Sequence, residues 1–536
     1  MKRISKKARR ITALALSVLC ALSLFSCIGR SSRTPGDCNN DGAVNGIDAL
    51  LLCRYLSGET VLLSKTNADL NSDGICNEGD SGALKEYLSG TAMPGHRFSA
   101  IYLNNINISS YRIVISENAD SFEKWTAELF ADAIRDLCGE ELEIITDGEK
   151  ESPCEILIGK TDRAYSEEND PEEGKYLVYA KTTKIILKGQ DYLVAGGAGH
   201  LIDKLEASDV LWNGSVNLSV SFEPDSHSVE WREADRILLF IGDGMGLNHT
   251  RLATEEAPVV QYTDDTLSAP DEKGEAVFWP STFETVGEAI TLNIQESTTD
   301  SAAGATALST GYKTLNGALG MIPADLDGDG DEDEFRAVQN VREAAALRGL
   351  ATAVVSTDKL TGATPNAFLV HHTSRKDRNI ILEQQTALAS TRLDYNYLWC
   401  SYDSDSALEE LKAAIDTCDD NRNGFFIMAE EAMIDKFAEK VDFDNVIRTV
   451  KRLNEMTAYA ATYAMCHRDT AIIVTADHET GGLTKGEDSV WRWTSDGEHT
   501  GTNVPVFAMG HGTEIFHDNT FQNTAIATFI FATIER

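Results

Sequence analysis

Three apolar runs in the C-terminal half of the chain each end in side chains that commonly bind metal ions. The runs and the residues that follow them are 237–242 with Asp243, 424–429 with Glu430, and 471–476 with Asp477 and His478. Stretches with helical spacing separate these runs, and buried strands that alternate with helices indicate a mostly parallel sheet covered on both faces. Ligands of such sheets bind beyond the carboxyl ends of the strands, where these side chains fall. Residues 235–536 are therefore predicted to form a three-layer α/β/α sandwich with a metal site at one edge of the sheet.

The length and charge of the chain set further limits. A chain of 536 residues is too long for one hydrophobic core, so about three folded units are expected. The 47 Lys and Arg residues against 85 Asp and Glu residues give a net charge of −38. Such a surface disfavours nucleic acids and anionic membranes as partners and favours metal cations. An anionic substrate would be repelled unless local cations reverse the field at its site.

Residues 1–27 have the features of an export signal. A basic segment precedes the apolar run 11–25, which has the length of a signal core and is too short to span a membrane. The sequence Leu24-Phe25-Ser26-Cys27 is similar to a bacterial lipobox, in which Cys27 would carry the lipid. We expect an exported protein, either lipid-anchored at the cell surface or secreted, whose contact with a membrane is confined to such an anchor.

An internal repeat follows at 36–90. Oxygen-bearing side chains recur at positions 1, 3, 5, 9 and 12 of two loops that each have Gly at position 6, a pattern that suits Ca²⁺. These side chains are Asp37, Asn39, Asp41, Asn45 and Asp48 in the first loop, and Asp69, Asn71, Asp73, Asn77 and Asp80 in the second. The pair resembles a type I dockerin, which implies calcium binding and a cohesin-bearing scaffold protein as partner. A calcium-stabilised spacer without a partner is the alternative.

Residues 97–230 read as a small α/β domain. Two β-rich runs flank a helical stretch at 121–137, and the runs 176–180 and 184–188 are spaced like a hairpin. Because no catalytic combination of residues occurs there, a spacer or packing role is the default interpretation.

Residues Asp300 and Ser301 open an Ala-rich helical stretch. The backbone N–H groups at the start of a helix favour an oxyanion, so Ser301 is a candidate nucleophile. An ordinary N-cap serine is the alternative.

Eight motifs in the C-terminal part occur in the order typical of one enzyme family. They are 242–246, 299–307, 313–320, 362–365, 373–375, 434–436, 475–478 and 499–501. Over 235–536 the chain resembles the alkaline phosphatases. This resemblance implies a metal-dependent phosphomonoesterase with two Zn²⁺ and one Mg²⁺, small-molecule phosphomonoesters as substrates and a phosphoserine intermediate. It is also compatible with a homodimer.

The resemblance assigns a role to each matching residue. Ser301 would be the nucleophile, Arg375 would grip the phosphoryl oxygens, and Lys436 would add positive charge near the phosphate. The implied metal ligands are Asp243, Asp477 and His478 for the second zinc, Asp435 and His499 for the first zinc, and Asp243, Thr364 and Glu430 for magnesium. These cations would reverse the sign of the field in a cleft of an acidic protein.

Two positions depart from the family pattern. Gly362 stands where bacterial members have an Asp beside the magnesium site, so a group that tunes the metal is missing. Glu439 stands where the family has a His ligand of the first zinc, and we predict that its carboxylate still binds the metal.

A separate acidic loop spans 325–334. Asp325, Asp327, Asp329 and Asp333 match positions 1, 3, 5 and 9 of a calcium loop, but Arg336 stands at position 12. A Ca²⁺ site and a solvated acidic loop both remain open.

The sequence thus predicts an exported phosphomonoesterase with a dockerin-like module. The alternatives are another hydrolase of the same superfamily, such as a phosphodiesterase or a sulfatase, and a dockerin-bearing surface module whose catalytic site has decayed.

Overall fold

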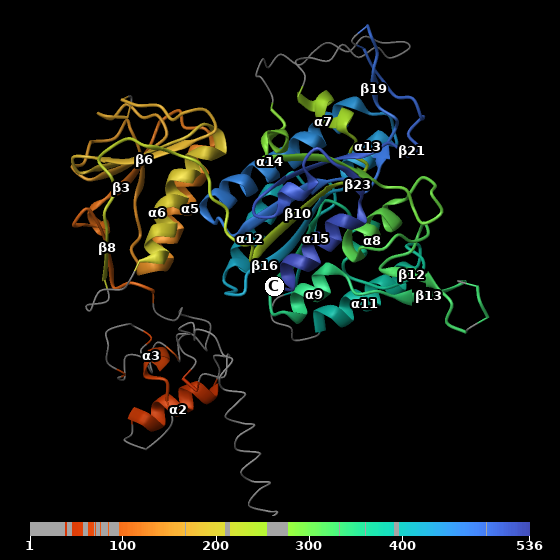
Figure 1. Cartoon of the computed structure of the whole chain (residues 1–536), viewed down its shortest axis with the longest axis horizontal. Helices are drawn as coiled ribbons and strands as arrows, with labels where there is room; N and C mark the ends of the chain where they lie inside the picture. Colours follow the sequence, from red (N-terminus) through yellow and green to blue (C-terminus); the bar gives the residue numbers. More distant parts are fainter. Residues whose placement is uncertain are drawn as a thin grey trace, which may run out of the picture. The chain divides into compact units, whose positions relative to one another are not determined.

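The computed structural model forms two compact units, Met1–Ser110 with Asp132–Leu142 and Ala207–Ser219, and Tyr111–Ala131 with Glu143–Glu206 and Val220–Arg536 (Figure 1). The structure describes residues 38–39, 46–56, 63–68, 70, 76, 84, 96–166, 168–208, 215–254, 277–327, 329–331, 333–359, 361–390, 396–488 and 490–536. The predicted export signal with Cys27 lies outside these residues, as do the calcium-loop positions Asp37, Asp41, Asn45, Asp69, Asn71, Asp73, Asn77 and Asp80.

The first unit contains two short helices of the dockerin-like segment, α2 (Gly46–Leu56) and α3 (Lys65–Ala68). Leu52 and Leu56 lie four residues apart and therefore share one face of α2. Their cluster is completed by Cys38, Leu63, Ala68, Leu70, Cys76 and Leu84. The same unit holds a sheet in which β1 (Ala100–Leu103) pairs with β2 (Ile106–Asn107) and, in parallel, with β8 (Ser215–Leu218). A turn of 3-10 helix, η1 (Ile108–Ser110), follows β2.

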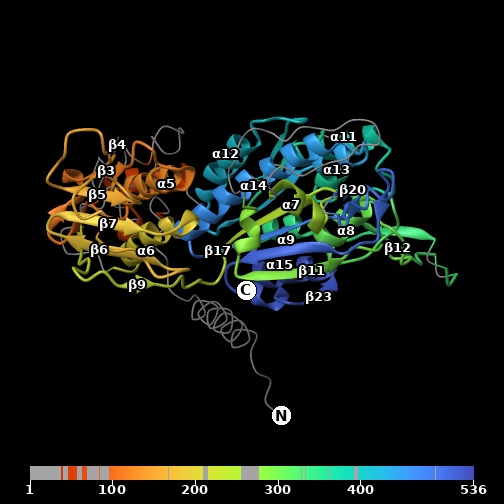
Figure 2. The same ribbon diagram turned by 90° about the horizontal axis from the view of Figure 1, so that it is seen from above.

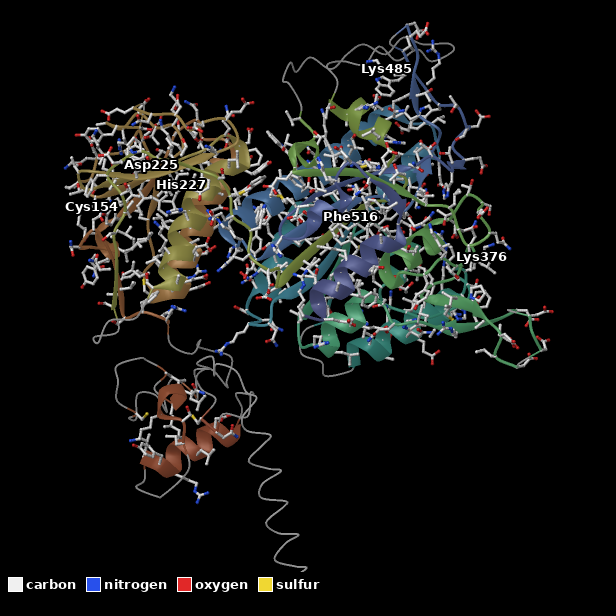
Figure 3. The ribbon with its side chains drawn as sticks, viewed as in Figure 1. Cys154, Asp225, His227, Lys376, Lys485 and Phe516 are labelled. Carbon is white, nitrogen blue, oxygen red and sulfur yellow. The ribbon has the colours of Figure 1, made fainter. Side chains whose placement is uncertain are left out.

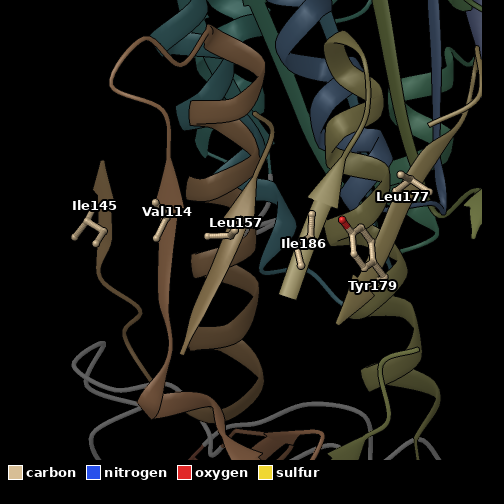
Figure 4. Packing of buried hydrophobic residues seen from close by; sticks show 6 residues of the cluster. All are labelled: Val114, Ile145, Leu157, Leu177, Tyr179 and Ile186. Atoms are coloured by element: carbon tan, nitrogen blue, oxygen red, sulfur yellow. The ribbon is translucent and has the colours of Figure 1, made fainter. Parts of the chain in front are cut away.

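A six-stranded sheet occupies the start of the second unit. Its strands, in spatial order, are β4 (Ile144–Thr146), β3 (Arg112–Ile115), β5 (Glu155–Ile158), β7 (Lys184–Lys188), β6 (Tyr176–Lys181) and β9 (Ser226–His227). Strands β6 and β7 pair antiparallel, which confirms the predicted hairpin. Figure 4 shows the core cluster, to which five neighbouring strands contribute Val114, Ile145, Leu157, Leu177, Tyr179 and Ile186. The helices of this segment are α5 (Ser121–Cys138), η2 (Asp191–Leu193) and α6 (Val194–Ala207).

An eight-stranded sheet forms the centre of the second unit. Its spatial order is β15 (Asn396–Cys400), β14 (Ala351–Ser356), β16 (Phe425–Glu431), β10 (Arg236–Gly242), β17 (Thr470–Thr475), β22 (Val504–Met509), β11 (Thr285–Ile290) and β23 (Thr520–Gln522). In this spatial order the first five strands, β15, β14, β16, β10 and β17, are mutually parallel. Strand β22 runs antiparallel to both of its neighbours, β17 and β11. The predicted mostly parallel sheet is confirmed.

Helices cover both faces of this sheet (Figures 1 and 2). One layer contains α7 (Leu247–Thr254), α12 (Ala407–Asp419), α13 (Met433–Ala438) and α14 (Phe443–Cys466), and the other contains α8 (Ser301–Thr310), α9 (Val341–Leu347), α10 (Ala363–Asn366) and α15 (Thr524–Ile534). The remaining elements are α11 (Arg378–Ser390), η3 (Trp279–Thr282), η4 (Thr513–Phe516) and the short strands β12 (Met321–Ala324), β13 (Glu334–Ala337), β18 (Glu479–Thr480), β19 (Thr484–Lys485), β20 (Trp491–Arg492) and β21 (His499–Thr500). The α/β/α sandwich is therefore the observed fold.

The register of the central strands aligns the candidate metal ligands. Ile241 of β10 pairs with Glu430 of β16 on one side and with Thr475 of β17 on the other. These strands are almost wholly buried, as parallel strands covered on both faces are. Because parallel strands end at the same edge, Asp243 and Asp477 leave the sheet beside Glu430.

The end of α14 packs closely against α6. A Cβ atom on Gly199 would lie 2.0 Å from the carbonyl oxygen of Met465, so only glycine fits there. The buried Arg468 guanidinium, just beyond α14, donates to the Tyr176 hydroxyl at 2.8 Å and the Gly196 carbonyl at 2.9 Å. The six-stranded and eight-stranded sheets are thus tied together within the second unit.

None of the helices in the described residues combines the length and the apolarity that are needed to cross a membrane.

We predict that Gly199→Ala destabilises the second unit. Alanine favours a helix by about 1 kcal/mol over glycine, but its methyl group would collide with backbone that cannot move freely, and overpacking costs about 1–3 kcal/mol. The urea midpoint of unfolding should fall. Gly197→Ala is the matched control, because its methyl group would approach no atom closer than 3.1 Å. An equal or higher midpoint for Gly199→Ala than for the control would contradict this packing.

Candidate active site

Ser301 is the first residue of α8 and is held in place by the N-cap Asp300. The Asp300 Oδ1 atom accepts hydrogen bonds from the backbone N–H groups of Ala303 and Gly317, both at 3.0 Å. One turn along the helix, a Cβ on Gly304 would lie 2.6 Å from the Asp477 carbonyl oxygen, so glycine lets α8 approach that strand end. As a result the Ser301 Oγ atom lies buried, 3.3 Å from Nε2 of His478.

Asp243, Asp477 and His478 bring one ligand atom each to within 4.8 Å of one another. The Nε2 atom of His478 lies 3.4 Å from Oδ1 of Asp243 and 3.5 Å from Oδ2 of Asp477. The Thr364 hydroxyl donates to the same two carboxylates, at 3.4 and 3.5 Å. The three residues that the resemblance assigns to the second zinc therefore converge, with Thr364 beside them.

A second group converges next to the first and shares His478 with it. Its members are Asp435, His478 and His499. The His499 Nε2 atom lies 3.4 Å from Asp435 Oδ1, and the rings of the two histidines stack with centroids 3.7 Å apart. The Thr299 carbonyl accepts a hydrogen bond from His499 Nδ1 at 3.1 Å, which orients the ring and turns Nε2 toward the group.

Glu430 lies beside these groups and has one partner among the described residues. Its Oε2 atom accepts a hydrogen bond from the Ser356 hydroxyl, whereas Oε1 is buried without a donor. In the same described part of the chain, Oδ1 of Asp243 is also buried without a donor. Leaving a buried carboxylate oxygen unpaired is costly, and a cation satisfies it. The residues present therefore fit a metal cluster.

Burial and mutual repulsion shift the acids of this cluster toward protonation. Burial and the Asp477 carboxylate raise the pKa of Asp243 well above its usual range, and burial and Asp243 do the same to the pKa of Glu430. Burial and Asp435 raise the pKa of Asp477 to about 7. A divalent cation would reverse these shifts, because it stabilises the ionised carboxylates.

The histidines differ in their protonation. Burial and the neighbouring His499 lower the pKa of His478 to about 4, so its ring is neutral, which is the form that binds metal ions. Burial is the largest single influence on His499 and lowers its pKa, but the hydrogen bond to Asp435, the negative charge of that carboxylate and the contact with the Thr299 carbonyl together outweigh it, and the pKa rises to about 9.

Two cationic side chains pair with acids of the candidate site. Arg375 donates to Asp300 Oδ2 at 3.2 Å, and Lys436 Nζ lies 2.9 Å from Asp435 Oδ2. Burial lowers the pKa of Lys436, but the carboxylates of Asp243 and Asp435 outweigh this and raise it. Both side chains line the same pocket, so both are placed to meet an anion there.

Glu439 is exposed at the end of α13. Its carboxylate is not among the groups of ligand atoms that converge within the described residues, although its partial burial and the nearby Asp435 raise its pKa. Its role as a zinc ligand stays a prediction. The Asp435 carboxylate is instead contacted by the Thr480 hydroxyl, which donates to Oδ1 at 2.6 Å.

Asp358 occupies the space that a side chain at position 362 would use. A Cβ atom on Gly362 would lie 2.2 Å from Oδ2 of Asp358. The Asp358 N–H donates to the Ser356 hydroxyl at 2.9 Å, and that hydroxyl in turn donates to Glu430. Sequence reasoning missed Asp358 and Thr480 because neither belongs to the matched motifs. An acid four residues before the unexpected glycine was the available signal for Asp358.

The two calcium-type regions are described to different extents. Of the ten dockerin-like positions, the structure describes Asn39 and the buried Asp48, whose Oδ1 atom accepts a hydrogen bond from the Asn39 N–H at 3.2 Å. In the acidic loop, Asp325 and Asp327 converge with Glu334 rather than with Asp329 and Asp333.

Comparisons with known proteins identify two matched regions of the chain. The alkaline phosphatase family model matches residues 234–398 and 393–496, and the type I dockerin domain model matches 35–89. Alkaline phosphatase 3 of Bacillus subtilis is 27% identical over 334 residues, which cover 51% of this chain and 67% of that protein. The alkaline phosphatase of Escherichia coli is 36% identical over 149 residues, 28% of each chain.

Among solved structures, the alkaline phosphatase from the Antarctic bacterium TAB5 is similar with a TM-score of 0.46 and 23% identity, over 57% of this chain and 99% of that one. The two family models place residues 234–496 with the alkaline phosphatases and residues 35–89 with the type I dockerins.

Proposed function

We propose that this chain is an exported phosphomonoesterase that acts through a phosphoserine intermediate at Ser301. One observation carries the proposal: the Ser301 hydroxyl lies at the positive end of α8 and 3.3 Å from His478, the residue that the two converging ligand groups share.

The ligand groups support the metal assignments that the resemblance implies. Asp243, Asp477 and His478 would hold one Zn²⁺, Asp435 and His499 the other, and Asp243, Thr364 and Glu430 the Mg²⁺. When bound, these ions would favour the alkoxide form of Ser301 and neutralise charge on the phosphoryl group.

The residues of the chain supply position and charge. The Ser301 oxygen, placed at the N-terminus of α8, would attack the phosphorus atom on the side opposite the leaving alcohol. The Ser–O–P bond forms as the P–O bond to the alcohol breaks, and the alcohol takes up a proton to replace the one that Ser301 gives up. Arg375, oriented by Asp300, donates its N–H groups to the phosphoryl oxygens. Water then attacks phosphorus and returns free Ser301 and inorganic phosphate.

The arrangement favours a monoester over the alternatives. A phosphate monoester carries two negative charges on its phosphoryl group, whereas a phosphate diester or a sulfate ester carries one. Because Arg375 and Lys436 line one pocket, and Arg375 pairs with Asp300 next to Ser301, a dianionic group gains more from them. Their presence together with the complete second-zinc set also disfavours a decayed site.

Asp358 is proposed to supply the acid that Gly362 lacks. Its carboxylate fills the space of the missing side chain, and its backbone N–H donates to the Ser356 hydroxyl, which in turn donates to Glu430, a proposed magnesium ligand. Outer groups of this kind orient the ligands and the bound waters of a metal ion.

The dockerin module supports a cohesin-bearing scaffold protein as partner and an extracellular or cell-surface location. Calcium is proposed for its two loops.

Ser301→Ala is expected to abolish turnover of p-nitrophenyl phosphate, with kcat reduced on the order of 10⁴-fold or more, because the attacking oxygen is lost. Rapid quenching with radioactive phosphate should label the wild type covalently and leave Ser301→Ala unlabelled. Ser297→Ala, an exposed serine four residues earlier, should behave as the wild type. Faster turnover of bis-p-nitrophenyl phosphate or p-nitrophenyl sulfate by the wild type would favour the alternative activities, and labelling of Ser301→Ala would contradict the nucleophile.

Asp358→Asn is expected to weaken Mg²⁺ binding by about 10- to 100-fold, the usual cost of losing an outer group of a metal site. Calorimetric titration and metal analysis measure this without relying on activity. Glu455→Gln, an exposed acid on α14, is the matched control.

In the same metal analysis, Glu439→Ala should lose zinc if its carboxylate is a ligand. Wild-type Mg²⁺ affinity in Asp358→Asn, or wild-type zinc content in Glu439→Ala, would refute the respective role.

Binding to a type I cohesin is expected to be lost on chelation and restored by Ca²⁺. Asp48→Ala, which removes the buried carboxylate of the first loop, should weaken the binding, whereas Asp327→Ala in the other acidic loop should leave it unchanged. A pull-down that is indifferent to calcium would argue against the docking role.

A further inference from the structure

The pocket that Arg375 and Lys436 line is formed mainly by cationic side chains, and through Arg375 it reaches Asp300, the neighbour of Ser301. Its volume is about 410 Å³. Five of its eight lining residues are Lys or Arg and one is an acid, in a chain with a net charge of −38. The lining residues are Asp358, Lys359, Thr361, Gly362, Arg375, Lys376, Arg378 and Lys436. The pocket therefore reverses the sign of the surrounding surface charge.

Two of the five cations already have a role at the phosphoryl group. Arg375 is paired with Asp300, and Lys436 is paired with Asp435. The other three are exposed, and within the described part of the chain no carboxylate forms an ion pair with them. These are Lys359, Lys376 (labelled in Figure 3) and Arg378. Lys359 makes a cation–π contact, with Nζ 4.9 Å from the centroid of the Tyr402 ring.

The single acid of the pocket does not neutralise these three cations. The Asp358 Oδ1 atom accepts a hydrogen bond from the Lys359 backbone N–H at 2.7 Å, and Oδ2 lies against Gly362. Like charges that gather without counter-charges repel one another, so the cluster is unfavourable until an anion enters it. A cleft lined by one sign of charge also concentrates ligands of the opposite sign.

The pocket is also larger than a phosphoryl group requires. Pockets of roughly 300–1,000 Å³ hold whole small molecules, so this volume leaves room for the alcohol part of an ester. A neutral alcohol would gain nothing from the three unpaired cations, whereas a second anionic group would meet them.

We propose that the preferred substrates are phosphate monoesters whose alcohol part carries a second anionic group, a carboxylate or another phosphate, bound by Lys359, Lys376 and Arg378. This inference rests on the proposed phosphomonoesterase activity and narrows its substrate class.

The test compares three esters of similar size: propyl phosphate, the phosphate ester of 3-hydroxypropionate, and propane-1,3-diol bisphosphate. The wild type should show kcat/KM at least about tenfold higher for the two esters with a second anion, which corresponds to about 1.4 kcal/mol. The preference should shrink with added salt, because exposed charges are screened. The two anionic esters distinguish a carboxylate site from a phosphate site.

The triple variant Lys359→Met, Lys376→Met, Arg378→Met should lose this preference and keep its rate with p-nitrophenyl phosphate within about twofold, since none of the three touches the reacting group. The matched control replaces three exposed lysines outside the pocket, Lys124, Lys150 and Lys451, by Met. Lys376→Met alone, with the smallest change to the fold, should lose part of the preference. Equal kcat/KM for the three esters in the wild type, or an unchanged preference in the triple variant, would overturn the proposal.

A binding measurement separates this proposal from the proposed function. Calorimetry with the non-hydrolysable pair propylphosphonate and 3-phosphonopropionate requires no turnover. If the wild type hydrolyses none of the esters, the proposed activity fails, while tighter binding of 3-phosphonopropionate that depends on the three cations still supports the pocket. Equal binding of the two phosphonates refutes the anion site.

Discussion

The repulsion between buried carboxylates at one edge of the eight-stranded sheet is the constraint on which the site depends. Because β10, β16 and β17 are parallel and in register, their carboxyl ends bring Asp243, Glu430 and Asp477 close together. Several buried carboxylates are tolerated in the folded state only if bound protons or cations offset their negative charges. Lys436 offsets part of this charge, and the unpaired oxygens of Asp243 and Glu430 mark where more positive charge belongs. Fold and chemistry are thus linked by the same strand ends.

The parts of the molecule that follow from local patterns could be predicted from the sequence. Apolar runs that end in acids predicted the parallel sheet and the position of Asp243, Asp477 and His478, and the Ala-rich stretch after Asp300 predicted the helix that presents Ser301. These two predictions agree with the structure because strand direction and helix polarity alone decide at which end of an element such side chains lie.

The parts that depend on contacts between distant segments could not be predicted. The Thr480 hydroxyl on β18 reaches Asp435 across 45 residues of chain. This contact has no fixed spacing in sequence, so no motif carries it. The division of 97–230 between the two units has the same cause, because β8 pairs with β1 across more than a hundred residues of chain. Asp358 differs, because it lies four residues before Gly362 and an acid at that spacing was a signal that the sequence offered.

The contact between Gly199 and Met465 has a consequence for how the protein can be dissected. The stretch that matches known phosphatases begins near 234, yet α14, whose neighbours include β10, β16 and β17, ends against a helix that lies before that point. A fragment trimmed to the matched stretch would uncover the buried Cys466 thiol and remove the partners of the Arg468 guanidinium. The smallest fragment that folds as the whole chain does is therefore longer than the stretch that the family model matches.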